Sequence, residues 1–351
     1  MGNVPNLRFP EFSGEWENCQ IANILSIGSG RDYKHLEKGN IPVFGTGGYM
    51  TSVNECIYDG ETTFIGRKGS INKPFYYNGK FWTVDTLFYT HSFNKTTPKF
   101  VYCLFQTINW LRYNEASGVP SLSKDTIEKI KVFIPQLDEQ RKISEMLSVI
   151  DERIATQNKI IEDLKKLKSA IRKKMFSLLK DEYTESFEIN QLLDYEQPTA
   201  YIVANDEYST DTSLTPVLTA NKGFILGYTD EKFGIYQKGE CIIFDDFTMD
   251  AKYVSFPFKV KSSAIKILTA KPNVNLRFMF EYLSYWELKS EEHKRHYISE
   301  IASLVIELPS KERQSIIASL MTSLNSKLDI EAKTKIRYEE QKRYLLSQMF
   351  I

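Results

Sequence analysis

Ile134-Pro135-Gln136-Leu137-Asp138-Glu139-Gln140-Arg141-Lys142-Ile143 is followed, 174 residues later, by a weaker copy of itself, Leu308-Pro309-Ser310-Lys311-Glu312-Arg313-Gln314. The same offset relates Pro42-Val43 to Pro216-Val217 and Met175-Phe176 to Met349-Phe350. One constant offset with no net gap indicates an internal duplication, and each copy is too long for a solenoid repeat. We therefore expect the 351-residue chain to carry two similar but non-identical modules at a set separation.

A long helix is predicted to follow Pro135 and to continue to about Lys180. Its apolar residues recur at alternating three- and four-residue steps, the heptad pattern of a helix that packs lengthwise on a partner. They are Ile143, Leu147, Ile150, Ile154, Ile161, Leu164, Ile171, Met175 and Leu178, with Gln157 and Lys168 as polar interruptions. At 1.5 Å per residue, this helix would be roughly 60 Å long.

A second long helix is predicted after Pro309, with Ser310 as its cap. Its apolar positions are Ile317, Met321, Leu324, Leu328, Tyr338, Leu345 and Met349, interrupted by Glu331, Lys335 and Lys342. Helices of this length cannot bury themselves in a small domain, so we expect them to pair with each other. If a pseudo-twofold axis relates the two halves, the pair is an antiparallel coiled coil.

The segments before the two helices are predicted to be β-rich modules of an α+β chain. Strands are expected at Ile41–Phe44, Thr62–Ile65, Phe81–Tyr89 and Ile130–Ile134, and at Pro216–Thr219, Cys241–Phe244, Tyr253–Phe258, Ala264–Leu268 and Leu304–Glu307. One helix should begin at Thr97-Pro98, and Asn275 should cap another that runs to Leu288. The predicted divisions are a first module (1–136), a first helix (137–180), a second module (181–308) and a second helix (309–351).

Composition excludes several classes of protein. The net charge is zero, which does not favour a simple polyanion binder, although nine acidic residues and no Lys or Arg concentrate in 181–211. The four cysteines lack the spacing of a zinc site or a disulfide framework. No signal peptide opens the chain and no 18-residue apolar run exists, so we expect a cytoplasmic protein.

Catalytic patterns are weak. Asp245, Asp246, Asp250 and Lys252 loosely resemble the carboxylates and lysine of Mg²⁺-dependent nucleases. The first module has Gly66, Arg67 and Lys68 at the comparable turn, so a loop that reads or excludes a base edge is the other interpretation. The chain has no Asn-Pro-Pro-aromatic or Asp-Pro-Pro-aromatic tetrapeptide, which argues against amino-methyltransferase activity in this chain.

The order of these features resembles the DNA-specificity subunit of type I restriction-modification systems. Three stretches carry the resemblance: Val4-Pro5-Asn6-Leu7-Arg8-Phe9-Pro10-Glu11-Phe12 with Gly14-Glu15-Trp16, the 134–143 joint, and Phe244-Asp245-Asp246-Phe247-Thr248. Related second modules commonly have an Asp-His-Thr-Arg run, in which Phe247 and Met249 here replace the His and Arg.

The resemblance implies two target-recognition domains, each reading one half of a split, asymmetric site in double-stranded DNA, with the helices setting the unread gap. It also implies two methylation subunits that carry S-adenosylmethionine and motor-nuclease subunits that use ATP and Mg²⁺. This chain itself would hold no cofactor. The helix surfaces are the expected docking sites, where Lys165, Lys166, Arg172, Lys173 and Lys174 either dock a partner, contact phosphate or solubilise the helix.

Loop side chains in both modules are the candidates for DNA contact, because base edges are read from the grooves while Lys and Arg bind phosphates. In the first module they are Lys34, Tyr49, Arg67, Lys68, Asn72, Lys73, Ser117 and Lys124. In the second they are Asn221, Lys222, Asp246, Thr248, Lys252, Lys294, Arg295 and His296.

Two alternatives remain at this point. One is a Mg²⁺ nuclease that uses Asp246, Asp250 and Lys252 and cuts DNA without partners. The other is a coiled-coil scaffold that does not contact DNA. The duplication itself favours a reader of a split site, since a monomeric nuclease does not need two divergent modules.

Overall fold

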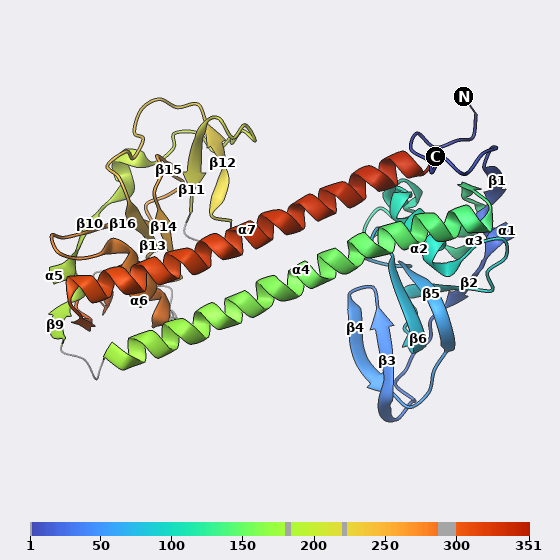
Figure 1. The fold of residues 1–351 in the computed structure, drawn as a ribbon, viewed down its shortest axis with the longest axis horizontal. Coiled ribbons are helices and arrows are strands. Elements are labelled where there is room, and N and C mark those ends of the chain that lie inside the picture. Colours follow the sequence, from blue (N-terminus) through green and yellow to red (C-terminus); the bar gives the residue numbers. More distant parts are fainter. Residues whose placement is uncertain (1, 180–183, 220–222, 287–299) are drawn as a thin grey trace. The chain divides into compact units, whose positions relative to one another are not determined.

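A computed structural model describes residues 2–179, 184–219, 223–286 and 300–351, and the chain forms two compact units. Unit 1 contains residues 1–159 and 332–351, and unit 2 contains residues 160–331. Two long helices, α4 (Leu137–Leu178) and α7 (Lys311–Met349), each contribute one end to each unit (Figure 1).

The first module is built on a six-stranded sheet in the order β2-β7-β5-β6-β3-β4, with a separate antiparallel pair, β1-β8. Its elements are β1 (Glu17–Gln20), α1 (Ile21–Ile24), β2 (Ser26–Ser29), β3 (Lys38–Gly45), β4 (Gly48–Val53), β5 (Tyr58–Gly66), β6 (Phe75–Thr83), β7 (Leu87–His91), α2 (Pro98–Thr107), α3 (Lys124–Lys129) and β8 (Lys131–Ile134).

The second module repeats this order. Sheet β10-β16-β13-β14 matches β2-β7-β5-β6, sheet β12-β11-β15 matches the β3–β4 hairpin with the end of β6, and the pair β17-β9 matches β1-β8. Its elements are β9 (Glu185–Glu188), α5 (Ile189–Leu192), β10 (Leu193–Glu196), β11 (Thr215–Leu218), β12 (Ile225–Thr229), β13 (Cys241–Asp245), β14 (Ala251–Val254), β15 (Lys259–Val260), β16 (Ile265–Ala270), α6 (Leu276–Tyr285) and β17 (Val305–Leu308).

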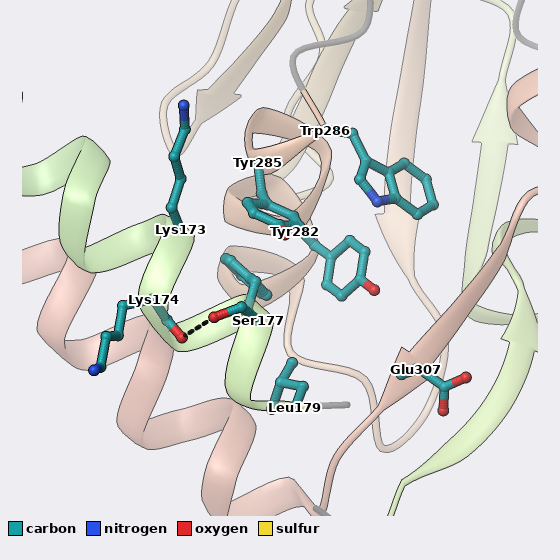
Figure 2. Close-up of a pocket in the computed structure, with 9 residues that line it drawn as sticks. Lys173, Lys174, Ser177, Leu179, Tyr282, Tyr285, Trp286 and Glu307 are labelled. Atoms are coloured by element: carbon teal, nitrogen blue, oxygen red, sulfur yellow. Dashed lines mark hydrogen bonds between the residues drawn. The ribbon is translucent and has the colours of Figure 1, made fainter. Parts of the chain in front are cut away.

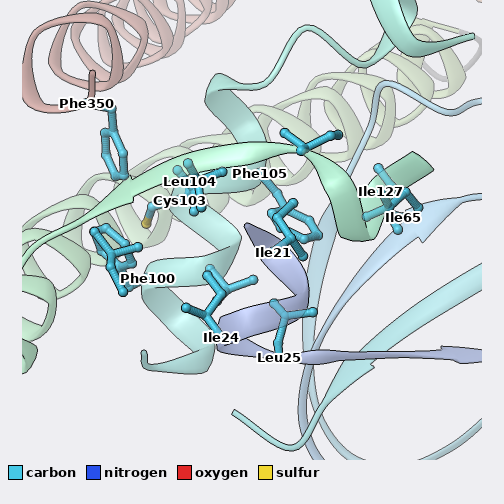
Figure 3. Packing of buried hydrophobic residues seen from close by; sticks show 14 of the residues in the cluster. Ile21, Ile24, Leu25, Ile65, Phe100, Cys103, Leu104, Phe105, Ile127 and Phe350 are labelled. Atoms are coloured by element: carbon cyan, nitrogen blue, oxygen red, sulfur yellow. The ribbon is translucent and has the colours of Figure 1, made fainter. Parts of the chain in front are cut away.

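Each module packs on the start of one long helix and the end of the other. In unit 1 the core joins Ile143 and Leu147 of α4 to Phe350 after α7, and the Phe350 ring stacks on Phe100 of α2 at 5.4 Å (Figure 3). In unit 2 the core joins Ile317 of α7 to Phe176 of α4, whose ring lies 5.5 Å from Phe278 of α6. The helices are therefore antiparallel within each unit, and the predicted α+β fold with paired helices is confirmed.

The duplicated joint has the same function in both units. Gln140 is fully buried, and its side-chain oxygen accepts a hydrogen bond of 3.0 Å from the backbone N–H of Thr97, while its nitrogen donates to the Pro135 carbonyl at 2.9 Å. Gln314 accepts 2.9 Å from the Asn275 N–H and donates 3.0 Å to the Pro309 carbonyl. Each glutamine thus holds the cap of its module helix against the start of a long helix.

We expect Gln140→Leu to lower the free energy of unfolding by about 2–4 kcal/mol, because it leaves the half-buried Thr97 N–H and the buried Pro135 carbonyl without their partner. Gln314→Leu should have a similar effect in unit 2. Exposed Gln136 supplies the control, and Gln136→Leu should change stability by less than about 0.5 kcal/mol. Urea unfolding measures all three. Equal effects at positions 136 and 140 would contradict this role.

Several predicted elements need correction. The strand expected at Phe81–Tyr89 is two strands, because the chain turns at 84–86, where Val84 N–H bonds to the Phe44 carbonyl. Of the strand expected at Tyr253–Phe258, only Tyr253 and Val254 are in a strand, the end of β14; Phe258 makes an isolated bridge with Tyr236, and β15 begins at Lys259. Leu178 is 41% exposed, and Leu179 is buried in its place. Helix α6 is described only to Tyr285, so its predicted course to Leu288 extends beyond the described residues.

Candidate nucleic-acid interface

The first module brings several loops together where β5 ends and β7 begins. The β5–β6 connection is tied to the 84–86 turn by a 2.8 Å hydrogen bond from Arg67 N–H to the Thr86 carbonyl, and Arg67 Nη1 donates to the Asp85 carbonyl at 3.3 Å. It is tied to the 114–123 loop by a 2.8 Å bond from Gly69 N–H to the Pro120 carbonyl. These three segments form one connected surface, which we call the loop cluster.

Two further segments border the loop cluster. Arg31 N–H donates to the Thr83 carbonyl at 2.8 Å, which attaches the 30–37 segment beside the 84–86 turn. The tip of the β3–β4 hairpin is close as well, since a Cβ built on Gly69 would lie 3.8 Å from Thr46 Oγ1. Gly69 has φ +84°, a conformation that strains any residue with a side chain. A glycine is therefore required at the centre of the cluster.

The 114–123 loop is held by its own polar side chains. Asn114 Oδ1 accepts hydrogen bonds from the N–H groups of Ala116 and Ser121, at 3.1 and 2.8 Å. The Glu115 carboxylate accepts from the hydroxyls of Thr126 and Ser123, and these bonds, Thr126 first, lower the pKa of Glu115. The loop is therefore ordered without burying much of its surface.

The sequence-predicted residues of the first module are mostly in or beside this cluster and point to solvent. Lys68, Asn72, Lys73 and Ser117 are exposed within it, and Arg67 is half-buried. Lys34 is exposed on the adjoining 30–37 segment, and Tyr49, 65% exposed, is the second residue of β4, beside the hairpin tip.

Lys124 differs from these residues. It opens α3, and its Nζ lies 3.5 Å from Glu128. Burial and then the charge of Lys124 lower the pKa of His91, which lies at the end of β7 remote from the loop cluster. Lys124 therefore lies directly after the 114–123 loop, at the start of α3, and not within the loops of the cluster.

Three residues of the same surface were missed from sequence. Arg31 is exposed beside the loop cluster, Met50 is 50% exposed after Tyr49, and Val119 is 67% exposed within the 114–123 loop. The signal for Arg31 was its position directly after Gly30, where strand β2 has ended. The two exposed apolar residues had no sequence signal, because exposure depends on which strands become sheet edges.

The second module gives a different result for Asp246. Its side chain is buried, and its Oδ2 lies 3.3 Å from Nζ of Lys266, which is equally buried. Asp245 Oδ1 accepts hydrogen bonds from the N–H groups of Phe247 and Thr248, at 2.9 and 2.8 Å. Asp245 therefore holds the turn, and the Asp246 carboxylate is paired with Lys266 inside the fold. A DNA contact by Asp246 stays a prediction.

The remaining candidates of the second module are divided. Thr248 is exposed on the 246–250 turn, and Lys252 is half-buried on β14, where it pairs with Ile243. Five candidates, Asn221, Lys222, Lys294, Arg295 and His296, lie outside the described residues. Within the described ranges, no group of three or more His, Cys, Asp or Glu side chains is placed to hold a metal ion.

The basic cluster predicted near the end of α4 has two parts. Arg172 is turned inward, with its Nη2 2.7 Å from buried Glu281 on α6. Lys173 and Lys174 are exposed and line a pocket with the aromatic side chains of Tyr282, Tyr285 and Trp286 (Figure 2).

On the surface of α4, Lys166 pairs with Glu162 at 2.6 Å, and the side chain of Lys165 is exposed. None of the helices in the described part of the chain has the length and apolarity needed to cross a membrane.

Comparison with known proteins gives two matches to one family model, the type I restriction modification DNA specificity domain, at residues 13–166 and 182–340. The specificity subunit of the type I restriction enzyme EcoR124I/EcoR124II of Escherichia coli is 39% identical over 178 residues, which are 45% of this chain and 43% of that protein. The putative type I restriction enzyme MjaX specificity subunit of Methanocaldococcus jannaschii is 24% identical over 288 residues, 72% of this chain and 67% of that protein.

Solved structures share the fold. The crystal structure of a type I restriction-modification S subunit from M. genitalium matches with a TM-score of 0.72 at 16% identity, covering 99% of each chain. A chain from a study of complex assembly and conformational transition in the type I R-M system matches with a TM-score of 0.53 at 12% identity, covering 95% of this chain and 97% of that one.

Proposed function

This chain belongs to the type I restriction-modification DNA specificity family, and from that premise we propose that it is the non-catalytic subunit that reads a bipartite, asymmetric target in double-stranded DNA. Each module would read one half-site. The proposed divisions are target-recognition domains at 1–136 and 181–308 and spacer helices at 137–180 and 309–351. The observation that carries the proposal is the repetition of one module plan with different loop chemistry.

The loop cluster supports a reading role for the first module. Loops on a rigid sheet can enter the major groove, where each base pair presents its own pattern of donors and acceptors. Asn72 and Arg67 are residue types that read adenine and guanine edges, and Lys34, Lys68 and Lys73 are exposed cations suited to phosphate. Because the loops differ between the two modules while the scaffold repeats, each module would recognise a half-site of different sequence.

We further propose that two methylation subunits dock on the long helices and supply S-adenosylmethionine and the transfer of methyl to adenine. Motor-nuclease subunits with ATP and Mg²⁺ would complete a restriction complex. Lys165, Lys173 and Lys174 are the proposed docking residues of the basic cluster. Arg172 is excluded from this role because its guanidinium is committed to Glu281.

The triple variant Lys34→Ala/Lys68→Ala/Lys73→Ala is expected to weaken DNA binding and to make the plot of log affinity against log salt shallower by about 0.9 for each phosphate that the variant no longer binds. Fluorescence anisotropy with a target duplex at several salt concentrations measures this. The charge-matched control is Lys80→Ala/Lys99→Ala/Lys131→Ala, three exposed lysines of the same module outside the cluster. Equal slopes for the two variants would overturn the assignment of the loop cluster, and no binding by the wild type with methylation subunits present would overturn DNA reading.

A further inference from the structure

Two lysines interrupt the apolar seams of the long helices at the same place. Lys168 of α4 and Lys342 of α7 are 174 residues apart, and their side chains are only 17% and 11% exposed. Burying an ammonium group is unfavourable unless it is paired, and an apolar residue at a seam position would stabilise the helix pair more. The seams also contain the matched polar pair Gln157 and Glu331, but Lys168 and Lys342 place an ammonium group at the same buried seam position in both helices, and this calls for an explanation.

In unit 1, Lys342 joins three elements. Its Nζ donates to Asp151 Oδ1 on α4 at 2.5 Å and lies 5.3 Å from the ring centre of Tyr102 on α2. The side chain of Asp151 is 32% exposed, so the ion pair lies at the edge of the seam. We call these three residues the Lys342 cluster.

In unit 2, Lys168 makes the corresponding contacts with the long helices exchanged. Its Nζ donates to Asn325 Oδ1 on α7 at 2.5 Å and lies 3.8 Å from Glu281 of α6. Asn325 Nδ2 also donates to Glu281 at 3.3 Å, and Arg172 makes bonds of 2.7 and 3.0 Å to the same carboxylate. Asn325 stands 174 residues from Asp151, so the duplication preserved the partner position as well. We call these four residues the Lys168 cluster.

Sliding one helix along the other would break both clusters. The seam neighbours of Asp151 are Leu147, Ile150 and Ile154, and those of Asn325 are Met321, Leu324 and Leu328. A shift of one helical turn, about 5.4 Å, would separate each ammonium from its partner and bring it against these apolar residues. Asp329, one turn after Asn325, would offer Lys168 a carboxylate for a shift in one direction only. Even in the native register, burial lowers the pKa of Lys168, and the nearby carboxylate of Glu281 opposes this effect without cancelling it. The desolvation of the Lys168 ammonium is therefore substantial. A single buried polar residue in a helix seam is known to specify register at a cost in stability.

We propose that Lys168 and Lys342 are positioning residues that fix the axial register of α4 and α7, each clamping both long helices to the module helix of its own unit. The two clusters are not interchangeable. The carboxylate comes from the long helix in unit 1 and from the module helix in unit 2. If the chain reads two half-sites, as proposed above, the register of the two helices also sets the number of base pairs between them.

The test separates register from stability. In Lys168→Met/Lys342→Met, Arg172 still pairs with Glu281 and Asp151 remains partly solvated, so we expect a melting temperature equal to or above that of the wild type. The matched control is Lys159→Met/Lys333→Met, which removes two exposed lysines from the same helices at the same offset of 174.

Register is measured by electron spin resonance between labels at Lys165→Cys and Ser326→Cys, both exposed and both in unit 2. Cys19 and Cys56 are replaced by Ser for this purpose, and Cys103 and Cys241 are buried. We expect one narrow distance for the wild type and the control, and a broadened or displaced distribution for the double methionine variant. An unchanged distribution, or a fall in melting temperature with no change in distance, would overturn the proposal.

A second variant makes the result independent of the methionine substitutions. Asp151→Lys alone places two ammonium groups together and should broaden the distance between labels at Val149→Cys and Gln341→Cys, two exposed positions in unit 1. Asp151→Lys/Lys342→Asp restores opposite charges and should narrow the distribution again. Failure of the reciprocal pair to narrow it would contradict the role of Lys342.

DNA binding then tests the consequence for spacing. With duplexes whose gap is one base pair shorter or longer than the preferred one, we expect the double methionine variant to lose roughly tenfold or more of the wild-type discrimination. Equal binding of the wild type to duplexes of every gap length would contradict the proposed reading of two half-sites. The distances between the labels would still test whether the two lysines fix the helix register. Retention of full gap discrimination by a variant with broadened distances would refute the link between register and spacing.

Discussion

Exchanging residues 15–135 for the matching module of a relative is expected to replace one half of the DNA target and to leave the other half unchanged. The loop cluster lies wholly within this segment, and its anchoring hydrogen bonds, such as Gly69 N–H to the Pro120 carbonyl, are internal to it. The exchange therefore transfers the proposed reading surface intact. The long helices stay in place, so the gap should also be unchanged.

The methylated motif in cells that carry the exchanged chain with its methylation subunits measures this result. The incoming module must keep residues equivalent to Thr97 and Phe100, because Gln140 and Phe350 pack on them from outside the exchanged segment. Exchange of 181–308 is the complementary control and should change the other half. A change in both half-sites after one exchange would rule out independent reading by the modules.

Replacing Asp246 by alanine is expected to lower the free energy of unfolding by about 3–5 kcal/mol, because the ammonium of Lys266 would remain buried without its carboxylate. Lys266 would keep only its 3.1 Å hydrogen bond to Gln197 Oε1 among the contacts described for it. Both side chains are 1% exposed, so the ammonium has almost no access to bulk solvent. Urea unfolding of the purified chain measures the loss.

The double variant Asp246→Ala/Lys266→Met distinguishes a structural role of Asp246 from a role in DNA contact or catalysis. Removing both charges should recover most of the stability, since a buried ion pair can be replaced by apolar groups at little cost. DNA binding should recover with it if Asp246 acts only inside the fold. If stability recovers but binding of the target DNA does not, Asp246 contacts the DNA as well.

Sequence reasoning predicted the elements that local patterns encode. The heptad steps predicted both long helices, and Thr97, Asn275 and Ser310 cap helices as expected, each accepting a hydrogen bond from the backbone N–H three residues on. The 174-residue offset aligned Gln140 with Gln314, and the structure gives the two side chains equivalent contacts. These features depend on residues close in sequence or on the duplication itself.

Features that depend on distant partners were not predictable in the same way. The acidic run at 245–246 gives no sign that Lys266, on another strand, would bury Asp246. The polar interruptions at Lys168 and Lys342 were visible, yet their partners lie on other helices. In the candidate interface, sequence identified several cationic loop residues but missed Met50 and Val119, whose exposure is set by the edges of the folded module.

Selection of bound duplexes from a randomised pool, by the chain assembled with its methylation subunits, tests the central claim most directly. Two modules that each read their own half-site predict two short specified blocks of different sequence, separated by a constant number of unspecified positions. One continuous block, or no enrichment of any sequence, would contradict the account.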